Sequence, residues 1–92
     1  MLFRSQSKEE NIVDICVLYH SNTVKKAIKV ATSLRNMDYE TMILPTEIDY
    51  QTTAPAKVAI YTEQNGFTLD DNGEITDFST IDELTTFLRK ER

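Results

Sequence analysis

The sequence is poor in the residues from which metal, redox and phosphate sites are commonly built. It contains one cysteine, Cys16, which excludes an intrachain disulfide and a cysteine-based zinc site. Its two glycines, Gly66 and Gly73, stand apart, so no glycine-rich turn is available to cradle a phosphate. His20 is the only histidine, and no hydrolase motif accompanies it. We therefore predict a protein that is not an enzyme and uses no metal or cofactor.

Long apolar runs are also missing. No run approaches the roughly 20 residues of a membrane-spanning helix, and residues 1–11 lack the continuous hydrophobic region of a signal peptide. These absences predict a cytoplasmic protein without membrane association, in which residues 1–11 form a flexible N-terminal segment or linker. Residues 12–92 are long enough to build one hydrophobic core, and we expect them to form a single α/β domain.

Basic and acidic residues are unevenly distributed along the chain, whose net charge is −5. Residues 1–37 contain six Lys or Arg and three Asp or Glu, whereas residues 38–83 contain eleven acids and Lys57 as the only base. Such an acidic second half repels phosphate backbones, so the charge pattern disfavours nucleic acid as a partner. The acids within residues 70–77 lack the ligand spacing of a calcium loop and indicate a solvated hairpin.

Residues 12–44 predict a strand, an amphipathic helix and a second strand. The stretch 12–19 is almost continuously apolar, as in a strand buried on both faces, and Cys16 within it is expected to be a small buried hydrophobe. Three residues then offer a side-chain oxygen that can cap a helix start: Ser21, Asn22 and Thr23. Apolar residues recur at helical spacing at Val24, Ala27, Ile28, Ala31 and Leu34. Asn36 is placed to end the helix in the left-handed conformation, and residues 39–44 predict a strand parallel to the first.

The second half of the chain predicts a loop, a third strand and a hairpin. Residues 46–56 are polar and bracketed by prolines, as in a loop, and residues 57–62 are a short apolar run expected to lie beside the first strand and parallel to it. Asn72-Gly73 separates two runs of alternating polarity, 67–69 and 74–78, which is a strong hairpin signal because both turn positions tolerate positive φ.

A second helix is predicted at the C-terminal end. Thr80 and Glu83 have the spacing of a capping box, in which each side chain accepts a hydrogen bond from the backbone N–H of the other residue. An apolar stripe follows at Ile81, Leu84, Phe87 and Leu88. Together these elements predict an α/β fold: a mixed five-stranded sheet with a parallel β-α-β start, an antiparallel C-terminal hairpin and two main helices.

Candidate binding residues cluster where the first strand meets the first helix. His20 directly follows that strand, where open α/β sheets place their ligand crevices. The helix start beside it offers backbone N–H groups that attract anions, which gives a candidate anion or ligand site: His20, Ser21, Asn22 and Thr23. No orienting partner for His20 is visible, so a structural role is favoured over a ligand site. The basic residues of the helix form a candidate docking surface: Lys25, Lys26, Lys29 and Arg35.

The order of these stretches carries a family resemblance. Residues 17–19, 27–37 and 39–44 are followed by residues 58–63, 73–78 and 80–84. In this order they resemble the opening strand, helix, second strand, third strand, closing hairpin and last helix of the anticodon-binding domain of class II aminoacyl-tRNA synthetases. Two departures stand out. Asn36-Met37 replaces the glycine region that follows the family's Leu-Arg pair, here Leu34-Arg35, and residues 45–56 are too short and polar for the helix that the synthetases carry there.

The resemblance implies an anticodon-binding-like fold over residues 12–90. Within this superfamily, histidyl-tRNA synthetase-like proteins that no longer charge tRNA serve as regulatory subunits of ATP phosphoribosyltransferase in histidine biosynthesis. The acidic second half makes the chain more similar to such a regulatory relative than to a working synthetase. Our leading hypothesis is a non-catalytic interaction or regulatory domain that binds a protein partner or the rest of a longer chain. Two alternatives stay open: a tRNA anticodon-binding module that uses the basic helix, and a small anion-binding protein that uses His20 to Thr23.

Overall fold

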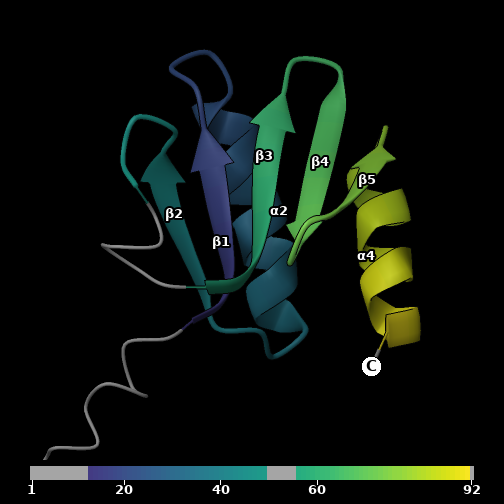
Figure 1. Ribbon diagram of the computed structural model, residues 1–92. Coiled ribbons are helices and arrows are strands. Elements are labelled where there is room, and N and C mark those ends of the chain that lie inside the picture. The colour runs from purple at the N-terminus through teal and green to yellow at the C-terminus, as the bar shows by residue number, and fades with distance from the viewer. Residues whose placement is uncertain (1–12, 50–55, 92) are drawn as a thin grey trace, which may run out of the picture.

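The computed structural model describes residues 13–49 and 56–91 and confirms the predicted α/β fold. Five strands form one mixed sheet in the order β2-β1-β3-β4-β5 (Figure 1). The elements are β1 (Val13–Tyr19), α2 (Val24–Asn36), β2 (Thr41–Pro45), β3 (Ala56–Glu63), β4 (Gly66–Asp71), β5 (Glu74–Phe78) and α4 (Ile81–Glu91). The expected N-terminal linker and residues 50–55 of the expected loop lie outside the described residues. Neither of the two described helices is long and apolar enough to cross a membrane.

β1 lies between two parallel neighbours, as the predicted arrangement requires. Val17 is opposite Ile43 of β2 on one side and opposite Ile60 of β3 on the other. β4 runs antiparallel to β3 and β5 runs antiparallel to β4, so the sheet is mixed. The predicted hairpin is confirmed, because Asn72 and Gly73 adopt φ angles of 58° and 97°, as a tight two-residue turn needs.

The prediction that Asn36 ends the first helix in the left-handed conformation is wrong. Asn36 is still helical, and Asp38 takes that conformation, with a φ of 71°. The N–H of Tyr39 donates to the carbonyl of Leu34 at 3.1 Å, and the N–H of Asp38 donates to the carbonyl of Arg35 at 3.0 Å. This pair of bonds is a Schellman motif. Leu34 lies in the core and Tyr39 packs against it, so this apolar contact fixes the end of α2. β2 therefore begins at Thr41, two residues later than expected.

The buried face of α2 also differs from the predicted one. The buried residues of the helix are Ala27, Val30, Ala31 and Leu34. Val24 and Ile28, expected to be covered, are 36% and 50% exposed. An α-helix turns by about 100° per residue, so Val24 and Ile28 lie on the same side of α2 as Arg35. The Arg35 guanidinium donates to the Thr41 carbonyl at 2.9 Å, which places this side of the helix next to the edge strand β2. Val24 and Ile28 are exposed because this side lies at the edge of the sheet.

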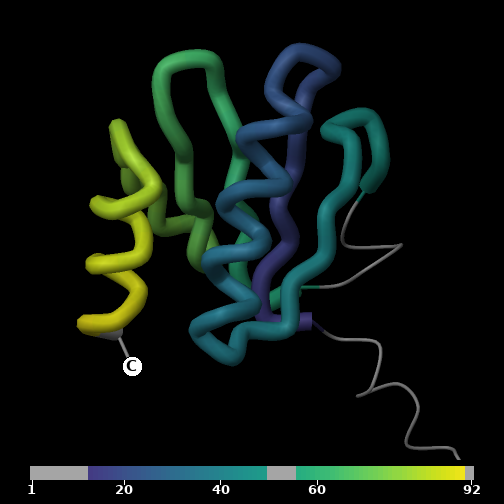
Figure 2. The backbone as a smooth tube through the Cα atoms, turned by 180° about the vertical axis from the view of Figure 1, so that it is seen from behind, coloured from purple at the N-terminus to yellow at the C-terminus, as the bar shows by residue number. Residues whose placement is uncertain are grey.

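Both helices pack on one face of the sheet and enclose the main core between them (Figures 1 and 2). Leu34 of α2 and Leu84 of α4 are fully buried together with Ile60 and Leu69 of the sheet.

The start of α4 follows the predicted cap in part. The Glu83 N–H donates to the Thr80 hydroxyl at 3.1 Å, but the Glu83 carboxylate accepts from the N–H of the preceding Ser79 at 2.9 Å, not from that of Thr80.

A smaller buried cluster lies on the opposite face of the sheet. It consists of Cys16 and Leu18 of β1 with Ala59 of β3, all at most 1% exposed. Burial raises the pKa of the Cys16 thiol to about 11, because ionisation would place a thiolate in apolar surroundings. The expectation that Cys16 is a buried hydrophobic residue is thus confirmed.

Candidate functional site

The residues His20 to Thr23 join β1 to α2 through a tight turn. The N–H of Thr23 donates to the carbonyl of His20 at 3.0 Å, and the N–H of His20 donates to the Thr23 hydroxyl at 2.9 Å. Thr23 is only 4% exposed, whereas His20, Ser21 and Asn22 are exposed. The turn therefore directs one hydroxyl into the protein and leaves three polar side chains at the surface.

The buried hydroxyl of Thr23 meets the hydroxyl of Thr62 on β3. The two Oγ1 atoms are 3.0 Å apart, and Thr62 Oγ1 lies 2.8 Å from the carbonyl oxygen of Leu18. A hydroxyl has one proton and a carbonyl can only accept, so Thr62 donates to Leu18. The Thr23 hydroxyl lies 3.0 Å from Thr62 Oγ1 and 3.2 Å from the His20 carbonyl oxygen, and its one proton serves one of these two acceptors. This chain of hydrogen bonds connects the end of β1, the start of α2 and the end of β3.

This use of Thr23 corrects the predicted cap of the first helix. Thr23 occupies the N-cap position, but no side chain caps the helix. Ser21 and Asn22 do not serve as caps either. A buried hydroxyl must find its partners inside the protein, and Thr62 and the His20 N–H provide them here. The first backbone N–H groups of α2 consequently lack a side-chain acceptor.

A polar cavity of about 600 Å³ lies beside this turn. Two loops at the carboxyl ends of β1 and β3 line it, with His20, Ser21, Asn22 and Thr23 on one and Glu63, Gln64 and Asn65 on the other. The four predicted site residues are thus brought together at the sheet edge where open α/β folds place their crevices. His20 Nδ1 is 3.4 Å from the Thr46 hydroxyl, a long contact that orients the ring weakly.

The cavity contains few of the groups that anion binding or catalysis requires. Glu63 contributes a carboxylate, which opposes an anion at short range. Lys26, the base of the predicted docking surface that lies closest to the β3–β4 turn, donates from Nζ to the backbone carbonyls of Glu63 at 2.6 Å and Gln64 at 3.0 Å. Its ammonium group also lies 5.1 Å from the centre of the Phe67 ring. Across residues 13–49 and 56–91, no group of three His, Cys, Asp or Glu side chains is placed to hold a metal ion.

The four basic residues of α2 divide into two pairs. Lys26 donates to the backbone carbonyl of Glu63 and Arg35 to that of Thr41, so both side chains tie α2 to the sheet. Lys25 and Lys29 are exposed, and they border a shallow hollow of about 330 Å³ between α2 and the start of α4. Within residues 13–49 and 56–91, Lys25 and Lys29 are the two bases of the predicted docking surface without a bonded partner, and the exposed apolar side chains of Val24 and Ile28 lie on the same helix.

Comparison with known proteins does not supply a family for this chain. No protein-family model matches it. No curated protein matches it either.

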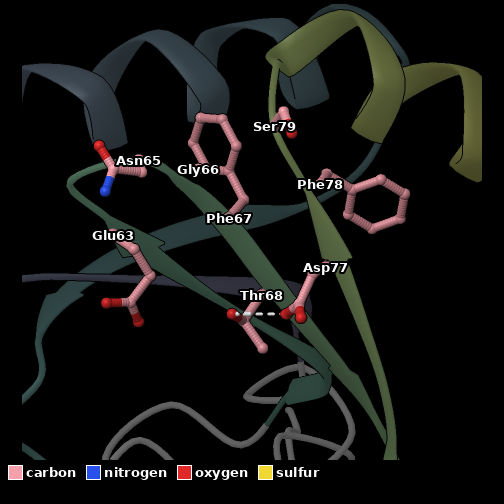
Figure 3. A pocket seen from close by; sticks show the side chains of 8 residues that line it. All are labelled: Glu63, Asn65, Gly66, Phe67, Thr68, Asp77, Phe78 and Ser79. Carbon is pink, nitrogen blue, oxygen red and sulfur yellow. Dashed lines mark hydrogen bonds between the residues drawn. The ribbon is translucent and has the colours of Figure 1, made fainter.

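Another hollow, of about 330 Å³, lies where the β3–β4 turn meets β5 (Figure 3). The rings of Phe67 and Phe78 lie on its helix side, while Thr68 and Asp77 lie on the other side and share a hydrogen bond of 3.1 Å. Gly66 begins β4 here, and a Cβ atom at this position would collide with the backbone carbonyl oxygen of Phe78. The hollow has neither a nucleophile with a base nor a convergent set of ligands.

Sequence reasoning missed two residues that shape the candidate site. Thr62 is fully buried and holds the turn through Thr23, and its only signal in the sequence is a polar residue at the end of an apolar run. Gly66 allows β4 to approach the end of β5, a contact between distant segments that has no local signal. Both residues position the loops of the polar cavity and do not project reactive groups into it.

Proposed function

We propose that this protein is a non-catalytic interaction domain that docks on an acidic surface of a protein partner, or of the rest of a longer chain, through the exposed side of α2. The composition of that side carries the proposal. Lys25 and Lys29 are exposed beside Val24 and Ile28, and α2 contains no acidic residue. Exposed apolar groups gain from burial in an interface, while the lysines select an acidic partner and speed the encounter.

The engagement of the other two bases supports a protein partner over nucleic acid. Lys26 and Arg35 are already bonded to backbone carbonyls, so a phosphate backbone would meet only two free lysines on α2. Non-specific nucleic-acid affinity grows with the number of phosphates that are neutralised, and two contacts give little of it. The acids that follow Met37 would add repulsion.

The family resemblance supports a regulatory role for this docking. The chain follows the order strand, helix, strand, third strand, hairpin and last helix, which is the order on which the resemblance to class II anticodon-binding domains depends. We therefore favour a regulatory domain of the kind that serves histidine biosynthesis in histidyl-tRNA synthetase-like regulatory subunits, working in the cytoplasm. Within the described chain, neither His20 nor the neighbouring hydroxyls form an acid–base couple, which supports a role without catalysis.

The test compares the wild-type chain with a Lys25→Gln/Ile28→Ser/Lys29→Gln variant. Immobilised chains are exposed to the proteins of the native host, and bound proteins are quantified by mass spectrometry. We expect at least one acidic protein to bind the wild type and to be lost with the variant. A Glu47→Gln/Glu74→Gln variant, altered at two exposed acids away from α2, should retain it. Identical binding by all three chains would refute docking through α2.

A titration with tRNA at low and moderate salt separates the nucleic-acid alternative. We expect weak binding that is unchanged by the lysine substitutions. Tight binding with a steep negative salt slope, reduced when Lys25 and Lys29 are neutralised, would replace the proposal with a tRNA-binding module.

Anion binding at the His20 to Thr23 turn is the second candidate function, because α2 begins without a side-chain cap beside a polar cavity. Inorganic phosphate is titrated while the His20 ring and the backbone N–H of Lys25 are followed by NMR. Saturable shifts at both positions, weakened by His20→Ala, would support this candidate. Absence of saturation at millimolar phosphate would reject it.

A further inference from the structure

An apolar groove of about 370 Å³ opens at the opposite end of β1 and β3 from the polar cavity. Its walls come from the sheet and from the last turns of α4, with Ile15, Val58, Leu69, Phe87 and Leu88 as the apolar lining. β1 and β3 begin and α4 ends at the lower edge of the molecule in Figure 1, and residues near these ends line the groove. Tyr39 closes one side, and its hydroxyl donates to the Leu88 carbonyl at 3.3 Å.

The rim of the groove is acidic. It carries three carboxylates, from Asp14, Asp38 and Asp71, and one ammonium group, from Lys57. Lys57 lies 3.7 Å from the Asp14 carboxylate, so this pair is largely neutral. Within the described part of the chain, the exposed carboxylates of Asp38 and Asp71 have no ion pair. Two uncompensated negative charges therefore flank an apolar floor.

The negative field comes from the rim carboxylates, because bases in the last turns partly neutralise both helix ends, Arg35 in α2 and Arg89 and Lys90 in α4. α2 ends beside Asp38, and α4 ends beyond Leu88, so both helices point their carboxyl ends toward the edge that holds the groove (Figure 1). The carboxyl end of a helix carries partial negative charge from its last carbonyls and favours cations. A ligand for this groove must therefore combine an apolar group with positive charge.

The spacing of the charges indicates an extended ligand. The two unpaired carboxylates come from different layers of the molecule, Asp38 from the segment that follows α2 and Asp71 from the last residue of β4 in the sheet. A compact molecule with one cationic head would satisfy one carboxylate and leave the other unpaired. An extended peptide advances roughly 3.3 Å per residue, so bases on either side of an apolar residue can reach both carboxylates while that residue enters the groove.

We propose that this acid-rimmed groove binds a short basic segment of a partner protein, which inserts one bulky apolar side chain between Lys or Arg residues. Complementarity of charge argues for this occupant, because the rim is negative and the floor is apolar. The site is independent of the docking proposed for α2, since it uses the carboxylates beyond the end of the helix and not its exposed side, and it selects the opposite charge.

The probe is a fluorescein-labelled peptide of sequence Lys-Lys-Phe-Leu-Lys-Lys, and binding to the full chain is followed by anisotropy and by NMR. We expect saturable binding that weakens with added salt, and amide shifts at Ile15, Val58 and Phe87. A matched peptide with Ser-Ser in place of Phe-Leu should bind at least about tenfold more weakly, because the apolar anchor is lost.

Substitutions on the protein side separate the groove from general charge attraction. Asp38→Asn/Asp71→Asn should weaken binding at least about fivefold, and Asn tolerates the left-handed conformation at position 38. Glu47→Gln/Glu63→Gln carries the same charge change at two exposed acids outside the groove, at the opposite end of the sheet, and should alter binding less than about twofold. The Lys25→Gln/Lys29→Gln variant should bind the peptide no more weakly than the wild type, which keeps this test separate from that of α2.

Four results would overturn the proposal. The first is equal weakening by the two acid-neutralising variants, and the second is amide shifts confined to residues outside the groove. The third is self-association of the free chain that shifts the groove amides with protein concentration, which would assign the groove to a second copy. The fourth is a shift of these amides on Phe3→Ser substitution without peptide, which would assign it to the chain's own first residues.

Discussion

The hydroxyl oxygens of Thr23 and Thr62 lie 3.0 Å apart and join the first residue before α2 to β3. Both side chains are buried, at 4% and 0% exposed. Through Thr62 the pair also reaches the Leu18 carbonyl at 2.8 Å. The loop that carries His20 is therefore held by buried polar bonds, and its position depends on a residue 39 positions further along the chain.

Thr62→Val should lower the free energy of unfolding by about 1–3 kcal/mol. Valine keeps the shape of threonine but removes the buried hydroxyl that donates to the Leu18 carbonyl and contacts the Thr23 hydroxyl. Urea unfolding measures the change. Thr32→Val is the matched control, because the exposed Thr32 hydroxyl donates only to the Ile28 carbonyl of its own helix, at 2.9 Å. Equal losses of unfolding free energy in the two variants would show that the buried hydrogen bonds of Thr62 stabilise the fold no more than the exposed bond of Thr32 does.

The unfolding free energy should fall as the pH rises from about 9 to about 11, because the folded protein raises the pKa of Cys16 from 9.0 to about 11. The unfolded chain loses this proton first, so ionisation favours unfolding in that window. The full loss is roughly 3 kcal/mol and is absent below pH 9. Cys16→Ala should remove the part of this pH dependence that comes from the thiol and leave the contribution of the other titrating groups unchanged.

Thiol labelling gives an independent check on Cys16. At pH 8 a maleimide should react with the folded protein only at the rate at which the chain opens, since the residue is fully buried. Labelling should accelerate with urea in parallel with unfolding. Rapid labelling in the absence of denaturant would contradict the burial of β1.

Gly66→Ala should destabilise the protein more than Gly73→Ala does. At Gly66 the added methyl group meets the Phe78 backbone carbonyl, and backbone can yield only by displacing β5. At Gly73 nothing lies within 4 Å, and the cost is the conformational strain of alanine at a φ of 97°, about 1 kcal/mol. Thermal unfolding of the two variants compares them. A larger effect at Gly73 would place the strain in the hairpin turn instead.

Lys26→Gln should destabilise the fold by about 1 kcal/mol, whereas Lys25→Gln should leave stability unchanged. Lys26 donates to two carbonyls of the β3–β4 turn and lies over the Phe67 ring, while Lys25 is exposed. Urea unfolding of both variants measures the difference. Equal stability would mean that Lys26, like Lys25, is available to a partner.

Much of the architecture followed from local patterns. The apolar run of β1, the periodicity of the two helices and the Asn72-Gly73 turn each depend on neighbours in sequence, and the structure confirms the elements they predicted. The end of α2 did not follow, because the contact between Leu34 and Tyr39 outweighed the local preference of Asn36. The same holds for Val24 and Ile28, whose exposure depends on where the sheet ends.

Hydrophobic periodicity and turn chemistry are local properties, so the α/β class, the parallel start of the sheet, the closing hairpin and the burial of Cys16 could be predicted from the sequence. The use of the polar groups could not, because it depends on contacts between segments that are distant in sequence. In the folded protein the Thr23 hydroxyl bonds to Thr62 and does not cap α2, and Lys26 and Arg35 donate to backbone carbonyls. The fold also gathers Asp14, Asp38 and Asp71 around one apolar groove. Polar side chains bond to whatever the fold brings within reach, and that proximity is not encoded by their neighbours in sequence.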